Sequence, residues 1–319
     1  MSNAGSPHGV NAHEGLSPAA PHLPARIVAG QRASAGGGGK SGAAREAANV
    51  AALSIWPAEA IRQQVVPLLP GFTMQVLPAI DSTNSELMRR ARAGQRDPVL
   101  LVAERQTAGR GRLGRHWHSD GPPAAGGAIP AQGTGSGAGS LTFSLALPLA
   151  PNDWSGLSLA VGVSVVRSLH PQLRLKWPND IWLDDRKLAG ILIETASFGE
   201  SRFAVIGIGI NILPRAGEGL STPPASLQEV LPELDAPAVL LRVAPALVQA
   251  LLLFETQGFA PFKAAFKTRD MLYGRAIILS DGTTGDAAGV DGTGALMVHT
   301  SSGMKAITSA EVSVRPVGA

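Results

Sequence analysis

The sequence predicts an α+β protein, and three observations support that fold class. Between residues 57 and 211, segments with helical spacing of apolar residues alternate with short apolar runs typical of strands. From Arg275 to Val317, short β-rich runs are separated by Asp-Gly turns, which are hairpin signals. The segment Met1–Ala48 is low-complexity Gly, Ala, Ser and Pro, a composition that cannot bury enough apolar surface to offset its ordering entropy. We therefore expect a disordered tail at residues 1–48, followed by an ordered α+β region.

Length and composition exclude several classes of protein. The 319 residues suffice for about two domains with a sizeable core. The absence of cysteine excludes disulfides, thiolate zinc sites and cysteine nucleophiles. A net charge of +3 is too small to argue for nucleic-acid binding by itself. We expect no bilayer-spanning segment, because no apolar run is long enough, and no signal peptide, and hence a cytoplasmic protein without a membrane partner.

Helix boundary signals locate the element that follows residue 82. Thr83 and Glu86 form a capping box and Gly94 is a typical C-terminal stop, so we expect a helix at Asn84–Ala93. Capping alone would explain this motif, although a helix N-terminus also presents free N–H groups to an anionic or carbonyl-bearing ligand. The other expected elements are helices at Pro57–Leu68 and Trp154–His170, strands at Thr73–Leu77, Val99–Glu104, Leu141–Leu147 and Phe203–Asn211, and a flexible insertion at Gly121–Ser140.

The segment Glu104–Ser119 (ERQTAGRGRLGRHWHS) combines glycines with arginines in a way that a solvated surface does not need. Glycine allows the backbone to approach a ligand closely, and arginine offers a planar fork of donors that suits phosphate and carboxylate. We interpret the segment as an anion-clamping loop, most plausibly for a phosphate or an acyl phosphate. Its members are Arg105, Arg110, Arg112 and Arg115, with Gly109, Gly111 and Gly114 between them.

Two alternatives exist for this loop. It formally matches the dinucleotide fingerprint G-x-G-x-x-G, but that fingerprint requires a helix opening at its last glycine, and here the chain continues as RHWHSDGPP without helical periodicity. The other alternative is a solvated basic loop, since runs of charge usually face water.

A second polar cluster is predicted in Arg174–Glu194 (RLKWPNDIWLDDRKLAGILIE). Short strands at Arg174–Lys176 and Ile181–Leu183 flank a Pro-Asn-Asp turn, and a turn at 184–186 leads into a strand at Leu188–Glu194. The polar residues could be mere turn formers and a strand-edge charge. The residues that these hairpins bring together are Lys176, Asn179, Asp180 and Lys187.

The strand at Phe203–Asn211 (FAVIGIGIN) is interrupted by Gly207 and Gly209. Glycine weakens a strand interior and often marks the close approach of a ligand or of another backbone. We therefore expect this strand to border a binding site.

Taken together, these segments resemble the biotin protein ligases, or biotin–[acetyl-CoA-carboxylase] ligases. They span about residues 80–211 in the family's order, and a weaker resemblance, to the family's small SH3-like barrel, covers Arg275–Val317. The matching motifs are Ser82-Thr83-Asn84, Gly109–Trp117 (GRGRLGRHW), Lys176–Asp180 (KWPND), Lys187–Glu194 (KLAGILIE) and Gly207–Asn211 (GIGIN).

The resemblance implies a fold and an activity. The implied fold is a mixed sheet flanked by helices, similar to the core of class II aminoacyl-tRNA synthetases, with a small C-terminal SH3-like β-barrel. The implied domains are a catalytic biotin/ATP-binding domain at 49–270, with the flexible insertion at 121–140, and a C-terminal domain at 271–319. In the implied reaction, biotin and Mg-ATP give biotinyl-5′-AMP and pyrophosphate. A lysine of the biotin carboxyl carrier domain of a carboxylase, such as acetyl-CoA carboxylase, then takes the biotinyl group and releases AMP.

The resemblance also implies roles for individual residues. The biotin carboxylate must attack the α-phosphate of ATP although both are negative, so cations that contact both would stabilise the developing charge. The implied catalytic residues are Lys187, Arg110, Arg112 and Asp180, the last near the incoming carrier lysine. The implied biotin-binding residues are Ser82, Thr83, Asn84, Gln106, Gly109, Arg110, Gly111, Arg112, Lys187, Gly190, Leu192 and Gly207. The implied nucleotide-binding residues are Arg110, Arg112, Arg115, Trp117, Lys176, Asn179, Asn211 and Arg315. Mg²⁺ is expected to be carried by ATP, and no residue is expected as a metal ligand.

The chain departs from the family at Leu113, where arginine is common, so one positive charge is absent from the loop. Two other function classes stay open: a related acyl ligase of the lipoate type, against which the GRGRLGRHW loop argues, and a nucleic-acid-binding regulator, for which a recognition helix is lacking. Because Met1–Ala48 cannot form a winged helix, the resemblance is to the monofunctional type without an N-terminal DNA-binding domain. The expected partners are biotin and the carrier domain, DNA binding is not expected, and a homodimer is left open.

Overall fold

The computed structural model describes residues 56–119, 139–217, 220, 222–308 and 314–317. The predicted tail at residues 1–48, and with it the question of an N-terminal DNA-binding domain, lies outside the described residues. So does the predicted insertion at 121–140, except for its last two residues. Ser140 is the first residue of a strand rather than the end of the insertion.

A seven-stranded mixed sheet forms the centre of the described fold, with the strand order β1-β2-β3-β7-β6-β5-β4. Strands β1 and β2 are parallel, and every other neighbouring pair is antiparallel. The sequence predicts strands in these places, with ends that differ by a few residues. The strands are β1 (Thr73–Ile80), β2 (Val99–Gln106), β3 (Ser140–Pro148), β4 (Arg174–Lys176), β5 (Asp180–Leu183), β6 (Arg186–Phe198) and β7 (Ser201–Asn211).

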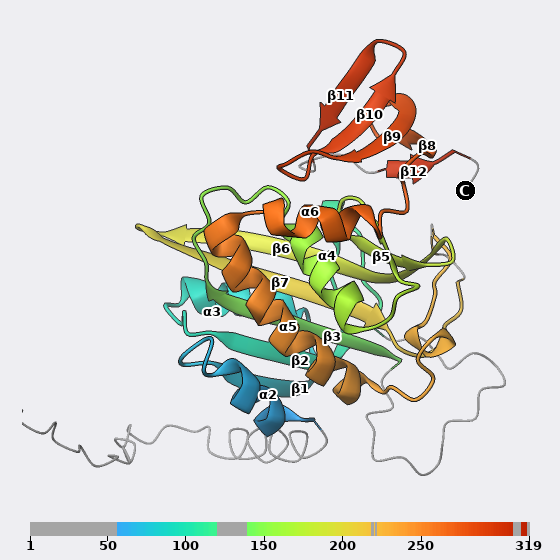
Figure 1. Ribbon diagram of the computed structural model, residues 1–319. Helices are drawn as coiled ribbons and strands as arrows, with labels where there is room; N and C mark the ends of the chain where they lie inside the picture. Colours follow the sequence, from blue (N-terminus) through green and yellow to red (C-terminus); the bar gives the residue numbers. More distant parts are fainter. Residues whose placement is uncertain (1–55, 120–138, 218–219, 221, 309–313, 318–319) are drawn as a thin grey trace, which may run out of the picture. The chain divides into compact units, whose positions relative to one another are not determined.

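Helices cover both faces of this sheet (Figure 1). On one face, α2 (Ala58–Val65), α4 (Leu157–Ser168) and α5 (Ala236–Gln257) enclose the main apolar core. On the other face, α3 (Thr83–Arg92) packs on β2, β3 and β7 through a smaller apolar cluster that includes Leu87. The predicted α+β architecture, a mixed sheet flanked by helices, is therefore confirmed.

The expectation that no segment is long and apolar enough to span a bilayer is wrong for α5. This helix has 22 residues, and its mean hydropathy of 1.9 passes that test by length and composition. Arg242 and Gln249 interrupt the apolar sequence, which is why no continuous run was recognised. Asp235 caps the helix by accepting a hydrogen bond from the Ala238 N–H at 2.9 Å, and Val239, Leu247 and other residues along it are completely buried. The apolar surface of α5 is thus used largely for packing against the sheet and its neighbouring helices.

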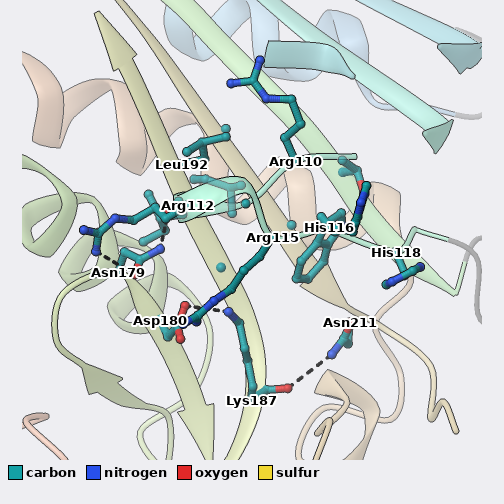
Figure 2. A pocket seen from close by; sticks show the side chains of 18 of the residues that line it. Arg110, Arg112, Arg115, His116, His118, Asn179, Asp180, Lys187, Leu192 and Asn211 are labelled. Atoms are coloured by element: carbon teal, nitrogen blue, oxygen red, sulfur yellow. Dashed lines mark hydrogen bonds and ion pairs between the residues drawn. The ribbon is translucent and has the colours of Figure 1, made fainter. Parts of the chain in front are cut away.

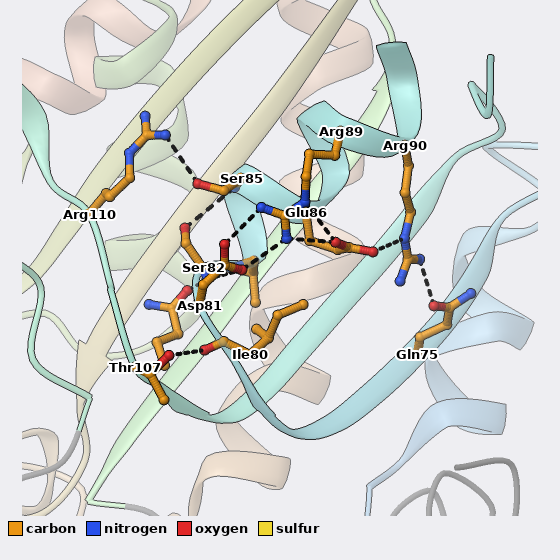
Figure 3. A network of polar contacts seen from close by, with 12 residues as sticks. Gln75, Ile80, Asp81, Ser82, Ser85, Glu86, Arg89, Arg90, Thr107 and Arg110 are labelled. Atoms are coloured by element: carbon orange, nitrogen blue, oxygen red, sulfur yellow. Dashed lines mark hydrogen bonds and ion pairs between the residues drawn. The ribbon is translucent and has the colours of Figure 1, made fainter. Parts of the chain in front are cut away.

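The predicted capping box at the start of α3 is also wrong. The N-cap is Ser82, whose Oγ accepts from the Ser85 N–H, so Thr83 is already inside the helix. Glu86, the expected partner of Thr83, instead pairs with Arg89 and Arg90 (Figure 3). The predicted stop is confirmed, because Gly94 follows the helix with φ +92°, a conformation that favours glycine.

The β4-β5-β6 hairpins form as predicted from Arg174–Glu194. The Trp177-Pro178 peptide within the first turn is cis. Asp184 and Asp185 occupy the second turn with φ of 47° and 58°, the left-handed geometry of a tight two-residue hairpin. Lys176 and Asp180 are paired across β4 and β5, while Asp180 faces Gly190 across β5 and β6.

A five-stranded antiparallel sheet follows α6 (Ala260–Lys267), with the strand order β11-β10-β9-β8-β12. Asp-Gly turns connect its strands, as predicted: Gly282 has φ +84°, and Asp291 Oδ1 accepts from the N–H of Thr293 at 2.8 Å. The buried Trp177 Nε1 donates to the Gly294 carbonyl at 3.0 Å, which links the β4-β5 hairpin to this sheet. Its strands are β8 (Ala276–Leu279), β9 (Thr284–Val290), β10 (Leu296–Thr300), β11 (Gly303–Ile307) and β12 (Val314–Pro316).

Candidate active site

A cavity of about 430 Å³ lies on the face of the sheet that carries α3. Its walls come from the start of α3, the segment Glu104–Ser119 (hereafter the arginine loop), strands β3, β6 and β7, the β4-β5 turn and β12. Every residue that the sequence analysis named as a ligand contact lines this cavity, with the exception of Gly109. Segments up to about 230 residues apart in sequence therefore meet in one place, from Ser82 to Arg315.

The fold explains why the two predicted polar motifs meet at one end of the cavity. Strands β1 and β2 are parallel and joined by α3, so the carboxyl ends of both strands lie at the same edge, with Ile80 opposite Gln106. The first turn of α3 and the last residue of β2 consequently face each other. Thr83 N–H donates to Gln106 Oε1 at 2.7 Å, and Thr83 Oγ1 donates to the same oxygen at 3.1 Å.

This part of the cavity, the hydroxyl end, is uncharged and almost fully buried. Its members are at most 8% exposed. Ser144, on β3, lies within 2.7 Å of Thr83 Oγ1 and donates to Asn84 Oδ1 at 2.6 Å. The bonded part of this network is rigid because Thr83, Asn84, Gln106 and Ser144 have partners before any ligand arrives, whereas the Thr142 hydroxyl has none among the described residues. We define the hydroxyl end as Ser82, Thr83, Asn84, Gln106, Thr142 and Ser144.

Glu194 connects the hydroxyl end to the arginine loop. The Asn84 amide donates to Leu192 O at 3.2 Å and to Glu194 Oε2 at 2.9 Å, while the other Glu194 oxygen forms an ion pair with Arg110 at 2.5 Å. Arg110 also donates to Ser85 Oγ at 3.1 Å. Its guanidinium consequently points away from Arg112 and Arg115 (Figure 2). Arg110 is thus held at Glu194 rather than beside Lys187, with which the sequence analysis grouped it.

The arginine loop is a small hairpin whose tip is a single 3-10 turn, η1 (Arg112–Gly114), and no α-helix opens there. Arg110 and His116 form an antiparallel bridge, and Gly111 N–H donates to the Arg115 carbonyl at 2.7 Å. The tip consists of Leu113, with φ 56°, and Gly114, with φ 70°. Left-handed geometry is natural for the glycine but costs free energy for leucine. This loop geometry agrees with the rejection of a dinucleotide fingerprint, which requires a helix here.

Three glycines leave room for close contacts around the cavity, two of them with Trp117 of the loop and one with Asn84 of α3. A Cβ on Gly209 would overlap with the Trp117 indole, and a Cβ on Gly109 would overlap with the Trp117 carbonyl. A Cβ on Gly207 would overlap with the side-chain amide of Asn84. The predicted close approach at Gly207 and Gly209 is therefore made by side chains of this chain, and Gly109 supports the loop from outside the cavity lining.

The opposite part of the cavity, the cationic end, concentrates positive charge. Lys187 Nζ lies 2.7 Å from Asp180 Oδ1, and Arg112 donates to Asn179 Oδ1 at 3.4 Å (Figure 2). Asp180 is the only carboxylate among the described residues that line the cavity. We define the cationic end as Arg112, Arg115, Lys176, Lys187 and Arg315, together with Asn179 and Asp180.

The backbone of Lys187 is fixed by two other segments. Its N–H donates to the Pro223 carbonyl at 2.9 Å, and its carbonyl accepts from the Ala225 N–H at 2.9 Å and from Asn211 Nδ2 at 3.3 Å. The Asn211 Oδ1 in turn accepts from Arg215 at 3.3 Å. The side-chain amide of Asn211, predicted to bind the nucleotide, thus holds the lysine in register. Its direct contact with a nucleotide stays a prediction.

Charge crowding and burial alter the protonation of the cationic end. Burial lowers the pKa of Lys176 to about 8; the nearby Asp180 opposes that change, whereas Lys187, Arg115 and Arg315 add to it. Burial also lowers the pKa of Arg112, although Asp180 favours its charged form. The Lys176 ammonium lies 4.9 Å from the centre of the Trp182 ring, a cation–π contact that partly replaces water. An anion in the cavity would relieve this repulsion.

The cavity also has lining residues that the sequence analysis did not name. Arg215 donates to the His118 carbonyl at 2.8 Å, and burial lowers its pKa. Thr142 is 4% exposed and lies on β3. Alternation of Ser140, Thr142 and Ser144 with apolar residues was a readable signal for polar residues on one face of this strand. Arg215 had no comparable signal, because it follows β7 in an irregular segment.

Among the described residues, no group of three or more His, Asp or Glu side chains could hold a metal ion. The single carboxylate of the cavity is already paired with Lys187.

Comparison with known proteins assigns the family. The model of the biotin/lipoate A/B protein ligase family matches residues 76–124 and 135–211, and that of the biotin protein ligase C-terminal domain matches residues 274–315. The bifunctional ligase/repressor BirA of Escherichia coli is 35% identical over 264 residues, which cover 79% of this chain and 77% of that protein. The chain belongs to the biotin/lipoate A/B protein ligase family. The predicted resemblance is confirmed.

Within this biotin/lipoate ligase family, the named relatives are biotin ligases. The biotin--[acetyl-CoA-carboxylase] ligase of Paracoccus denitrificans is 36% identical over 247 residues, covering 74% of this chain and 98% of that protein. The biotin protein ligase from Aquifex aeolicus in complex with biotin and ATP is 29% identical, with a TM-score of 0.61 over 76% of this chain and 98% of that chain. The match to the biotin protein ligase C-terminal domain confirms the prediction that the β8–β12 sheet is the family's small SH3-like domain.

Proposed function

We propose that this protein is a biotin–[biotin carboxyl-carrier protein] ligase. It activates biotin with ATP to biotinyl-5′-AMP and transfers the biotinyl group to a lysine of a carboxylase carrier domain, as in acetyl-CoA carboxylase. The observation that carries the proposal is the division of one cavity into an uncharged hydroxyl end and a cationic end, in a chain whose relatives are biotin ligases. The hydroxyl end suits the neutral urea ring of biotin, and the cationic end suits the phosphates of ATP and the carboxylate of biotin.

In the first step, an oxygen of the biotin carboxylate forms a bond to the α-phosphorus of ATP, and pyrophosphate leaves. Both reactants are negative, so the step needs positive charge placed before they meet. Lys187 is the best candidate to contact both, because its backbone is held by residues 223–225 and its ammonium is held by Asp180. Arg112, Arg115, Lys176 and Arg315 supply the remaining charge, and Mg²⁺ enters on the ATP phosphates.

In the second step, the amine of the carrier lysine bonds to the acyl carbon of biotinyl-AMP, AMP leaves and the amine loses a proton. Asp180 is 13% exposed at its side chain and lies beside Lys187, where its negative charge favours an incoming ammonium. Arg110 contributes by positioning the loop, because its ion pair with Glu194 fastens the loop to β6. Trp117 and Asn179 border the proposed nucleotide position, and Gly111, Gly190 and Leu192 form the wall of the proposed biotin channel. We further propose that the protein acts in the cytoplasm.

A mass measurement tests the proposal directly. The chain is incubated with biotin, Mg-ATP and a biotin carboxyl carrier domain, and each carrier molecule is expected to gain one biotinyl group. A carrier whose acceptor lysine is changed to arginine should gain nothing, and neither should a reaction without ATP. A parallel reaction with lipoate and a lipoyl carrier domain tests whether the protein is instead a lipoate-type acyl ligase. Modification of the lipoyl carrier without modification of the biotin carrier would refute the proposal.

A further inference from the structure

One face of strand β3 presents three hydroxyl side chains in a row. Ser140, Thr142 and Ser144 alternate with Leu141 and Phe143, whose side chains lie in the main core on the other face. The three polar residues are buried, with exposures of 3%, 4% and 0%. A hydroxyl removed from water to this extent costs free energy unless it has a hydrogen-bond partner.

The two outer hydroxyls have such partners. Ser144 Oγ donates to Asn84 Oδ1 at 2.6 Å, and Ser140 Oγ donates to the Ser119 carbonyl at 2.7 Å. Thr142 Oγ1 lies between them and is equally buried, yet no described residue forms a hydrogen bond with it. Of the three, only Thr142 lines the cavity. The one unsatisfied hydroxyl is therefore the one that a ligand can reach.

The surroundings of Thr142 define the chemistry of its missing partner. Its cross-strand neighbours, Ala103 on β2 and Gly209 on β7, have no polar side chain, and Gly209 is covered by the Trp117 indole. Its neighbour along the same face is Ser144, which belongs to the hydroxyl end. The complement is thus a neutral group that can donate or accept a strong hydrogen bond. A thioether sulfur accepts only weakly, whereas a cyclic urea has a carbonyl oxygen and two N–H groups.

We propose that Thr142 is a specificity-determining residue whose hydroxyl hydrogen-bonds the cyclic urea of the acyl substrate. This inference rests on the proposed function and deepens it. An acid whose ring lacks a urea, such as the dithiolane of lipoate, leaves the Thr142 hydroxyl buried and unpaired. A site built to hydrogen-bond a substrate discriminates strongly against analogues that lack the matching group, for that reason.

The substitution Thr142→Val removes the hydroxyl with little change in size. Without ligand, the melting temperature should rise by roughly 2–4 °C, because an unsatisfied buried group is removed. In calorimetric titrations, the dissociation constant for biotin should increase about tenfold. Desthiobiotin, which retains the urea and lacks the sulfur, should lose affinity by the same factor. Affinity for ATP should stay within about twofold of the parent value.

Two control variants separate a ligand contact from a packing effect. Thr142→Ser keeps the hydroxyl and should keep biotin affinity within about threefold of the parent value. Ser140→Ala removes a hydroxyl that already has a partner, so it should lower the melting temperature instead of raising it. If Thr142→Val does not fold, Thr142→Ala provides the same comparison of biotin with desthiobiotin.

Three results would overturn the assignment. They are an unchanged biotin affinity in the folded valine variant, a loss confined to biotin while desthiobiotin is unaffected, and a loss confined to ATP. The first result would show that the Thr142 hydroxyl does not contact biotin. The second would show that it contacts the ring sulfur, and the third that it contacts the nucleotide. Failure of the proposed function looks different, because the parent protein itself would then not bind biotin or form biotinyl-AMP.

Discussion

The two ends of the cavity differ in how far they are complete before a ligand binds. At the hydroxyl end, Thr83, Asn84, Gln106 and Ser144 satisfy one another through short hydrogen bonds and are at most 8% exposed. At the cationic end, positive groups outnumber carboxylates, and the loop that carries two of them ends in a strained left-handed turn at Leu113. Apart from the Thr142 hydroxyl, which has no partner among the described residues, the first end is a finished template, whereas the second is an unbalanced charge distribution.

The difference follows from the chemistry of the ligands that each end would hold. A neutral ring is recognised by fixed donors and acceptors, and those can satisfy one another within the protein at little cost. Triphosphate and carboxylate groups require a site in which positive side chains outnumber the carboxylates, because a site whose charges already balance attracts anions only weakly. The charged form of Lys176 is disfavoured before a ligand binds: burial lowers its pKa most, and the neighbouring cations Lys187, Arg115 and Arg315 add to that effect.

The largest effect is expected from Lys187→Ala. If this ammonium contacts both reacting anions, its loss should slow the first half-reaction by about 10²–10³-fold, equivalent to about 3–4 kcal/mol. Lys187→Arg should also fail substantially, since a planar guanidinium is wider than an ammonium. Biotin-dependent exchange of pyrophosphate into ATP measures this step without the carrier. Lys263→Ala, at an exposed position on α6, is the matched control. Exchange near the parent rate in Lys187→Ala would make Lys176 the lysine to test.

The next effect tests whether the hydroxyl end is a finished template. Ser144→Ala removes the hydroxyl that joins Thr83 to Asn84, so the free energy of unfolding should fall by about 1–2 kcal/mol. Biotin affinity should fall with it, while ATP affinity should not change. Urea denaturation and separate titrations of the two substrates measure these quantities. A variant with parent stability and parent biotin affinity contradicts the template interpretation.

A pH titration tests the cationic end. Lys176 is protonated below its pKa of about 8 and neutral above it, so its charge is present at pH 7 and mostly lost at pH 9. ATP affinity should therefore decline as pH rises through 8, by up to about tenfold. Lys176→Arg stays charged over this range and should flatten the profile. Parallel profiles for the two proteins would show that another group titrates.

The smallest effect concerns the tip of the arginine loop. Leu113→Asn places an Asn-Gly pair at the two left-handed positions, the preferred sequence for such a turn, and should stabilise the hairpin by about 1 kcal/mol. Hydrogen exchange at the Gly111 and Trp117 amides, which donate within the loop, reports its closure. Protection should increase about fivefold, with biotin affinity unchanged. The expected result is faster amide exchange in the parent than in the variant, and equal exchange rates would show that Leu113 is not strained in solution.

Much of the fold could be predicted from local sequence, because strands and helices with clear periodicity and turn signals need little tertiary information. The hairpins of Arg174–Glu194 and strand β7 are examples. The capping of α3 was predicted at the wrong residue because Ser82 and Thr83 are both good caps, and only the tertiary bond from Thr83 to Gln106 selects between them. Helix α5 was not predicted, because polar residues interrupt its apolar sequence. Only its packing against the sheet and the neighbouring helices shows which of its residues are buried.

The candidate site was predictable where family motifs name its residues, and less so where geometry alone decides. Asn211 lines the cavity, and its amide also donates to the Lys187 carbonyl, a contact that the motif did not indicate. Arg110 was grouped with Lys187, but in the structure it pairs with Glu194. Gly109 does not line the cavity and leaves room for the Trp117 carbonyl, while its contact with a ligand stays a prediction. Each of these differences depends on partners distant in sequence, which no single motif contains.

Gly207 and Gly209 carry no reactive atom, yet a change at either position would have a genetic consequence. A side chain on Gly209 would displace the Trp117 indole, and a side chain on Gly207 would displace the Asn84 amide. Missense alleles at these two codons should therefore reproduce the phenotypes of losing the neighbouring tryptophan or asparagine. A saturation mutagenesis map of the gene would show positions without any functional group that are as intolerant of change as the tryptophan and the asparagine themselves.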